Sequence, residues 1–133
     1  MRLWSGVGIL ALVACAQTVS DTSLERGREI FASYCASCHG SSGTGDGILA
    51  TDLPVRPADL TMLSKRNGGV FPTSDVMAKI YGYPGRYQAE VMPEFGPVLE
   101  GPSVRWTDEA GLQVDTPQAL LDLATYLQSL QDT

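Results

Sequence analysis

A helical pattern of apolar positions leads from residue 22 to residue 34. Apolar residues and one glycine recur there at spacings of three and four: Leu24, Gly27, Phe31 and Tyr34. In front of them, Thr22 and Glu25 have the spacing of a capping box, in which the two side chains satisfy free N–H groups of a first helical turn. The pattern predicts a helix that begins at Thr22 and leads into residue 35.

A second helical pattern closes the chain. Its apolar stripe consists of Leu120, Leu121, Ala124, Leu127 and Leu130. Thr116 and Pro117 precede the stripe and have the residue types preferred at an N-cap and at a first helical position. We predict an amphipathic helix from there to about Gln131. Gly27 has no side chain, so the two helices could approach closely at that position.

The middle of the chain shows little periodicity. Residues 40–73 carry no sustained pattern, and the 133 residues include 14 Gly and 8 Pro, which interrupt helices and strands. An irregular stretch of that length normally counts against a compact domain. A short helical pattern covers residues 76–81, and residues 97–115 match no motif. The length predicts one domain with few regular elements.

The first residues have the layout of an export signal: Arg2, an apolar run from Leu3 to Val13, and small residues. The run is shorter than the ~20 residues that cross a membrane as a helix. Residues 12–15 resemble a bacterial lipoprotein signal, which is cleaved before Cys15 and leaves that cysteine acylated. Cleavage after Ala16 by ordinary signal peptidase, which would discard Cys15, fits as well. We predict an export signal over 1–14, a tether over 15–21 and one domain over 22–133.

The net charge and the number of cysteines restrict the possible partners and the possible roles of the cysteines. Nine basic and 15 acidic residues give a net charge of −6, which argues against non-specific nucleic-acid binding, since that relies on Lys and Arg. The partners we expect are proteins or small molecules. The three cysteines are an odd number, so they cannot all pair within the chain.

Cys35, Cys38 and His39 form the motif C-x-x-C-H, which attaches c-type haem. Two sulfurs three positions apart on one helical turn can each bind one vinyl group of a porphyrin, and the adjacent His can reach the iron. A thioredoxin-like pair would need no His and a βαβ setting. A structural zinc site would need four ligands, whereas the chain has no further cysteine pair and no second His.

Further motifs surround these residues. They are Gly27-x-x-x-Phe31-x-x-Tyr34 before the cysteines, Gly43-Thr44-Gly45-Asp46-Gly47, Pro57-Ala58-Asp59-Leu60-Thr61 and Met92-Pro93-Glu94-Phe95-Gly96. Together they resemble a class I mono-haem bacterial cytochrome c over residues 22–131. The resemblance implies a small all-α fold, with three to five helices and long loops wrapped round one covalent haem c. At Ile48 the chain departs from relatives that often have Pro.

The resemblance also implies roles for individual residues. His39 would be the proximal ligand and Met92 the distal one, and the carbonyl of Pro57 would accept a hydrogen bond from the His39 ring. The chain has a single His, so a second His ligand is excluded, and a neutral soft ligand must be a Met. Met62 follows Pro57 too closely, and Met77 has a core-like position, which leaves Met92.

With both axial positions of the iron filled, the chemistry that remains is one-electron transfer. We therefore expect an electron carrier rather than an enzyme, exported to the periplasmic side and exchanging electrons with redox proteins. Acylated Cys15 would anchor it to a membrane. Two alternatives stay open: a haem subunit of a larger dehydrogenase or oxidase, such as a respiratory complex, and a haem sensor in which a ligand displaces Met92.

Overall fold

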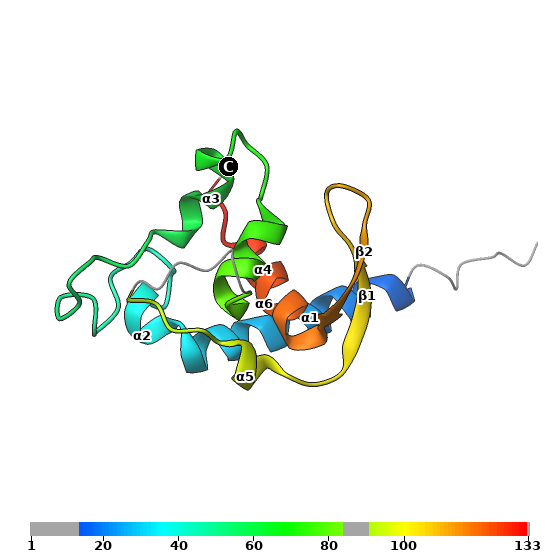
Figure 1. Ribbon diagram of the computed structural model, residues 1–133, viewed down its shortest axis with the longest axis horizontal. Coiled ribbons are helices and arrows are strands. Elements are labelled where there is room, and N and C mark those ends of the chain that lie inside the picture. Colours follow the sequence, from blue (N-terminus) through cyan, green and yellow to red (C-terminus); the bar gives the residue numbers. More distant parts are fainter. Residues whose placement is uncertain (1–13, 84–90, 133) are drawn as a thin grey trace, which may run out of the picture.

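Helices dominate the fold (Figure 1). The computed structural model describes residues 14–83 and 91–132. In order, the elements are α1 (Ala14–Tyr34), α2 (Ala36–His39), the 3-10 helix η1 (Leu60–Met62), α3 (Leu63–Arg66), α4 (Thr73–Tyr81), α5 (Gly96–Leu99), β1 (Ser103–Thr107), β2 (Gln113–Pro117) and α6 (Gln118–Ser129). Among these, α1, α4 and α6 exceed one turn, and the others are short. The predicted small helical fold is confirmed.

The two long helices α1 and α6 cross at Gly27. A side chain there would run into the main-chain carbonyl of Asp122 and the Cβ of Tyr126 on α6. Because Gly27 lacks that side chain, Phe31 can reach the Tyr126 ring, with the ring centroids 5.3 Å apart. The predicted close approach of the two terminal helices is confirmed. The buried core lies around this crossing and extends to α4 and α5: Phe31, Phe71, Met77, Ile80, Leu99, Leu120, Leu123, Ala124 and Leu127.

A buried carboxylate joins the same two helices. Asp122 is 1% exposed and accepts hydrogen bonds from Ser23 Oγ (2.5 Å), Arg26 Nε (2.6 Å) and Gln118 Nε2 (2.8 Å). Burial alone would raise the pKa of Asp122, but these hydrogen bonds and the Arg26 charge outweigh it, and the pKa is lowered. The carboxylate is therefore ionised at neutral pH and fastens α1 to α6.

Both predicted helix starts are wrong, the first by eight residues and the last by one. The first helix is already formed at Ala14, so Thr22 lies within it and not at its start. The residues between them include no Gly or Pro that would stop the helix. The last helix begins at Gln118, with Pro117 at the N-cap. Thr116 instead belongs to β2, where it is 2% exposed.

The segment that matched no motif forms an antiparallel hairpin. Strands β1 and β2 pair from Ser103 opposite Pro117 to Thr107 opposite Gln113. At the turn, Asp108 Oδ1 accepts hydrogen bonds from the backbone N–H groups of Ala110 and Leu112, at 2.9 and 2.8 Å. The hairpin stands beside α4 and α6 (Figure 1) and is the one sheet among the described residues.

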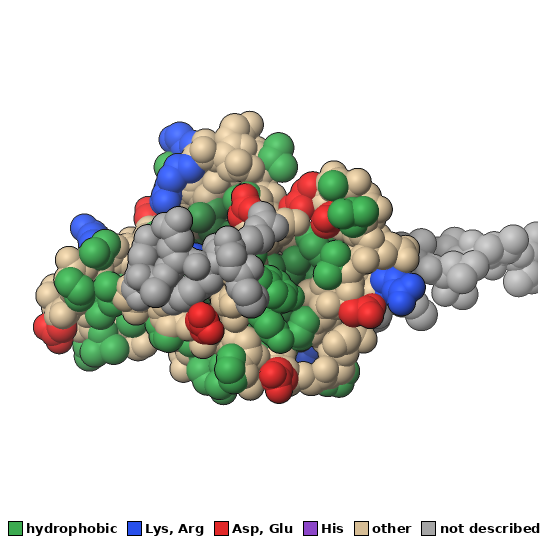
Figure 2. Space-filling model, in the orientation of Figure 1, with side chains coloured by type: hydrophobic (Ala, Val, Ile, Leu, Met, Phe, Trp, Pro, Cys, Tyr) green, Lys and Arg blue, Asp and Glu red, His purple; other side chains and the backbone are tan. Residues whose placement is uncertain are grey.

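Residues 40–59 form an irregular loop on the α2 side of the molecule, as the lack of periodicity over 40–73 predicted. Residues 60–66 of the same stretch are helical instead and form η1 and α3. Apolar side chains appear on this side of the molecule in Figure 2. In the loop, Ile48 is 84% exposed and Val55 is 67% exposed. Within the described part of the chain, no helix is long and apolar enough to cross a membrane.

Candidate functional site

The C-x-x-C-H residues lie on one turn. Cys35 follows α1 and is the N-cap of α2, and its carbonyl accepts hydrogen bonds from the N–H groups of Cys38 (3.2 Å) and His39 (2.9 Å). Both cysteines are free thiols and half-buried. Burial, with a smaller effect of the Cys38 charge, raises the pKa of Cys35 to about 12. The Cys35 thiol is therefore protonated at neutral pH, and the turn presents two separate sulfurs beside one imidazole.

The His39 ring is buried and anchored on one side. Its Nδ1 lies 2.9 Å from the carbonyl oxygen of Ala58, to which it donates a hydrogen bond. This assigns the proton to Nδ1 and leaves Nε2 free to bind a metal. The predicted acceptor, Pro57, is wrong by one residue, because the Pro57 carbonyl oxygen lies against Gly45 instead. The segment was predicted correctly, but the peptide group within it was not.

Asp59 holds the Ala58 carbonyl in place. Asp59 Oδ1 accepts hydrogen bonds from the N–H (2.9 Å) and the hydroxyl (2.7 Å) of Thr61, so its side chain caps η1. Arg66 donates to the main-chain oxygen of Asp59. The side-chain and backbone bonds from Thr61 lower the pKa of Asp59. Asp59 was not singled out from the sequence, although Asp followed two residues later by Thr is typical of such a turn.

Backbone hydrogen bonds fold the irregular loop onto the turn. They run from Gly45 N to His39 O (2.7 Å), Gly47 N to Cys38 O (3.1 Å), Leu49 N to Ser37 O (2.9 Å) and Leu60 N to Gly43 O (2.7 Å). The carbonyl groups at the end of α2 thus find partners in the loop rather than in a continuing helix. The loop therefore closes round the motif and brings residues 57–59 to the His39 ring.

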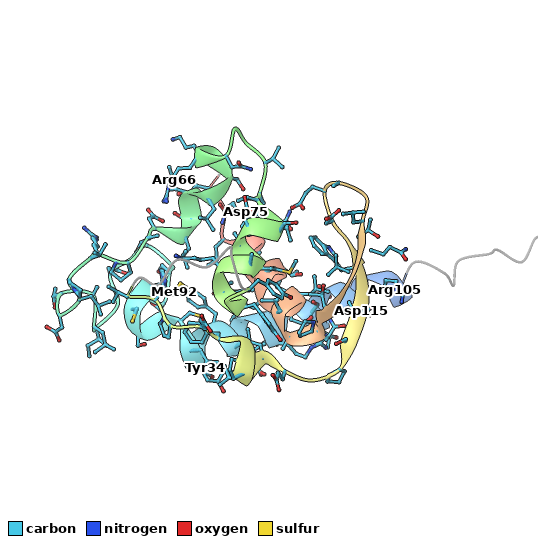
Figure 3. All side chains as sticks on the ribbon, viewed as in Figure 1. Tyr34, Arg66, Asp75, Met92, Arg105 and Asp115 are labelled. Atoms are coloured by element: carbon cyan, nitrogen blue, oxygen red, sulfur yellow. The ribbon has the colours of Figure 1, made fainter. Side chains whose placement is uncertain are left out.

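Met92 lies in a segment that returns to this region (Figure 3). The side chain is half-buried and packs on the same core as Cys35. Three residues further on, the Phe95 ring meets the Tyr34 ring with centroids 6.4 Å apart. Since Tyr34 directly precedes Cys35, this contact fastens the Met92 segment to the end of α1, beside the cysteine turn.

The remaining predictions about the leader are not tested. The export signal over 1–14 lies almost entirely outside the described residues. Of Cys15 only the backbone is described, in the first turn of α1. The stretch 15–21, predicted as a tether, is helical and continuous with residues 22–34.

The donor set fits one haem better than a free metal ion. Within residues 14–83 and 91–132, no three His, Cys, Asp or Glu side chains gather so as to hold an ion, so the zinc alternative has no ligand set there. Two free thiols on one turn can instead form thioethers, and His39 Nε2 can bind iron. When bound, the haem supplies one-electron redox chemistry.

These features define a haem-attaching electron-transfer domain. The family model of cytochrome c matches residues 24–131, and the chain belongs to the cytochrome c family. It binds one covalent haem c and transfers electrons with redox protein partners. No curated protein and no solved structure shows significant similarity to the chain.

Proposed function

We propose that this cytochrome is a one-electron carrier whose iron has His39 and Met92 as axial ligands. The contact between Phe95 and Tyr34 supports the proposal most directly, because it holds the Met92 segment beside the C-x-x-C-H turn. The other three methionines offer less: Met77 is buried in the core, Met62 lies in η1, and Met1 belongs to the leader.

The residues of the chain have distinct tasks in this carrier. His39 is held by Ala58, so its ring cannot turn away from the iron. Met92 contributes a neutral thioether, which stabilises ferrous iron and raises the potential. With both axial positions filled, no position remains for a substrate, and oxidation and reduction need little rearrangement.

Substitution of Met92 by Ala tests the ligand. We expect the wild-type ferric protein to be low-spin and six-coordinate with a Met–iron charge-transfer band. Met92→Ala should lose this band, bind carbon monoxide in the ferrous state, and lower its potential by roughly 0.1 V or more, within the ~0.8 V that axial ligands span. Met62→Ala removes another half-buried thioether and serves as the matched control.

The outcomes separate the candidate functions. Unchanged spectra in Met92→Ala would refute the ligand assignment. A wild type that binds carbon monoxide readily would favour the sensor over the carrier. Co-purification from the native host in a fixed ratio with a dehydrogenase or oxidase would favour the subunit.

We further propose that the protein is exported and held at the periplasmic side by lipid on Cys15. The odd cysteine supports this, because two of the three serve the haem and Cys15 remains. The intact mass of protein made in its native host tests it. One haem plus three acyl chains on a chain that begins at Cys15 is the expected result. One haem on a chain that begins after Ala16 would contradict lipidation but not export.

A further inference from the structure

The tip of the β1–β2 hairpin caps a helix to which it is not connected. The Glu109 carboxylate accepts hydrogen bonds from the N–H (3.0 Å) and the hydroxyl of Ser74, in the first turn of α4. First-turn N–H groups have no partner within their own helix. The N-cap of α4 is Pro72, whose side chain has no hydrogen-bonding atom. Glu109 therefore supplies the cap that the local sequence lacks, and its negative charge suits a helix N-terminus.

The hairpin holds Glu109 rigidly. The Asp108 side chain accepts from Ala110 N and Leu112 N, and Asp108 N donates to Leu112 O at 2.9 Å. These three bonds close the turn that carries Glu109. Ser74 and Glu109 bind each other so closely that the pKa of Glu109 is lowered, first by the Ser74 hydroxyl and then by the Ser74 amide.

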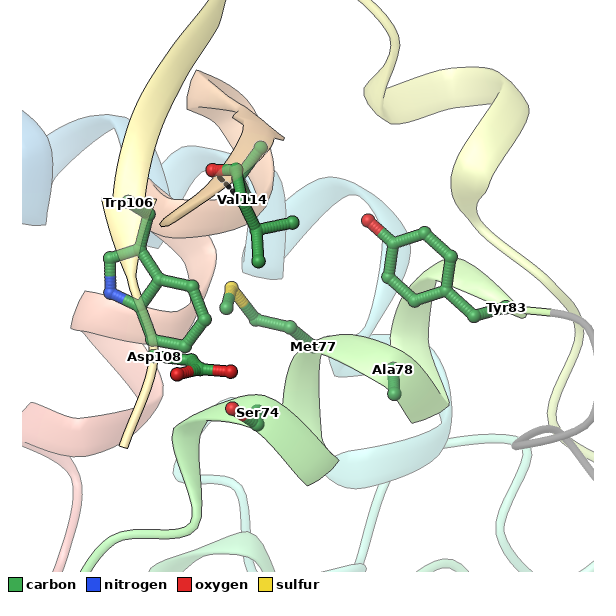
Figure 4. A pocket seen from close by; sticks show the side chains of 8 residues that line it. Ser74, Met77, Ala78, Tyr83, Trp106, Asp108 and Val114 are labelled. Carbon is green, nitrogen blue, oxygen red and sulfur yellow. Dashed lines mark hydrogen bonds between the residues drawn. The ribbon is translucent and has the colours of Figure 1, made fainter. Parts of the chain in front are cut away.

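Packing between the hairpin and α4 is incomplete elsewhere. A cavity of about 110 Å³ separates them (Figure 4). Its walls include Met77 and Ala78 of α4, and Trp106, Val114 and Thr116 of the hairpin. Ser74 and Asp108 also line the cavity. Because side chains do not fill this gap, the Glu109–Ser74 bonds matter more for the position of α4.

The other end of α4 holds the segment that follows Met92. Phe95 N donates to the carbonyl of Ile80 at 2.9 Å. Gly82 ends the helix with a φ of +86°, and the Glu94 side chain lies directly against it, where a Cβ would collide. Helix α4 thus connects Glu109 at one end with residues 94 and 95 at the other.

We propose that Glu109 is a positioning residue for Met92: by capping α4, it fixes the helix whose opposite end fastens the Met92 segment. This inference rests on the proposed His39–Met92 ligation. It gives the hairpin, which the sequence left without a role, a task in keeping the sixth ligand on the iron.

Competition by imidazole for the Met92 position of the haem-loaded ferric protein tests the inference. Loss of an N-cap typically costs ~1 kcal/mol, which is about fivefold in an equilibrium constant. We expect the apparent dissociation constant for imidazole to fall about fivefold in Glu109→Ala. Glu109→Gln can still bond to Ser74 and should stay within about twofold of the wild type. Hydrogen exchange should quicken in both residues 73–81 and residues 91–96 of Glu109→Ala.

Ser23→Ala is the matched control, since it removes a serine hydrogen bond that joins α1 to α6 and leaves α4 alone. It should lower the melting temperature without changing imidazole affinity. The inference fails if Glu109→Ala keeps wild-type imidazole affinity, or if Ser23→Ala changes it equally. Absence of a Met–iron charge-transfer band in the wild type would instead refute the ligation itself, and the inference with it.

Discussion

At the scale of single residues, Asp122 is a buried carboxylate whose hydrogen bonds join α1 to α6. Its carboxylate is buried, yet three side chains from two helices donate hydrogen bonds to it. A buried carboxylate without such donors would become protonated instead. Its stabilising effect therefore depends on pH with a defined sign, because a lowered folded-state pKa stabilises the fold in full only above the unfolded pKa and loses this effect as the pH falls to the folded pKa.

We predict that Asp122→Asn loses stability at neutral pH but not in acid. The wild-type advantage should be about 2 kcal/mol at pH 7. This advantage is complete above ~3.9, the pKa of an Asp carboxyl in the unfolded chain, and it disappears as the pH falls through the lowered pKa of Asp122 in the folded protein. Urea denaturation at pH 7, 5 and 3, followed by far-UV circular dichroism, measures it. Asp52→Asn, in the exposed loop, is the control. The prediction is contradicted if Asp122→Asn loses as much unfolding free energy at pH 3 as at pH 7.

Gly27 is a second residue whose identity is fixed by packing, because there is no room for a side chain at this position. We predict that Gly27→Ala destabilises the fold by roughly 2 kcal/mol, because the added Cβ strikes the Asp122 carbonyl and forces α1 and α6 apart. Gly101→Ala is the matched control, since nothing lies within 4 Å of a Cβ there. Thermal denaturation of both variants checks this. Equal melting temperatures would show that the helices can separate without cost.

At the scale of elements, the periodicity of apolar residues predicted the helices that bury an apolar stripe. It predicted few of the other elements. The stripe from Leu120 to Leu127 predicted α6, and Gly27 predicted its contact with α1. Helix starts were misplaced because a capping pattern does not show whether the preceding residues are also helical. Thr116 resembled an N-cap, but pairing with Val104 across the hairpin decided its conformation.

Tertiary contacts decided what local patterns could not. The hairpin strands have only five residues each. In β1 the positions alternate between exposed and half-buried, but in β2 they do not, so no period-two pattern extends over both strands to indicate a hairpin. At the site, the motif predicted that Cys35, Cys38 and His39 share one helical turn, and the structure places them so. The acceptor was displaced from Pro57 to Ala58 because the loop path determines which carbonyl faces the ring.

The cap of η1 gives a prediction at this scale. Asp59→Ala frees the turn that holds the Ala58 carbonyl and weakens its bond from His39. In the proposed ligation, that bond would make the imidazole a stronger donor to iron, which favours the ferric state. We therefore expect the reduction potential to rise by on the order of 20 mV, equivalent to about 0.5 kcal/mol. Spectroelectrochemical titration measures it, with Asp52→Ala as the control; a fall in potential would contradict the argument.

At the scale of the whole molecule, the irregular loop and the acidic charge acquire a common explanation. Residues 40–59 pack by hydrogen bonds onto the C-x-x-C-H turn, so a covalent haem supplies an apolar centre that the chain's few long helices do not enclose. The net charge of −6 becomes more negative if the leader, with Arg2, is removed. An electron carrier of this charge should meet positively charged reagents faster than negatively charged ones.

The dependence of the electron-transfer rates on salt concentration tests this electrostatic steering. We predict that reduction by hexaammineruthenium(II), a cation, slows by on the order of threefold when ionic strength rises from about 10 mM to about 200 mM, because the Debye length shrinks from ~30 Å to under 10 Å. Oxidation by ferricyanide, an anion, should quicken over the same range. Stopped-flow absorbance of the haem measures both rates, and uncharged hydroquinone as reductant should show no dependence. The opposite trends would mean that basic side chains near the haem edge, rather than the net charge of the molecule, govern the approach of a partner.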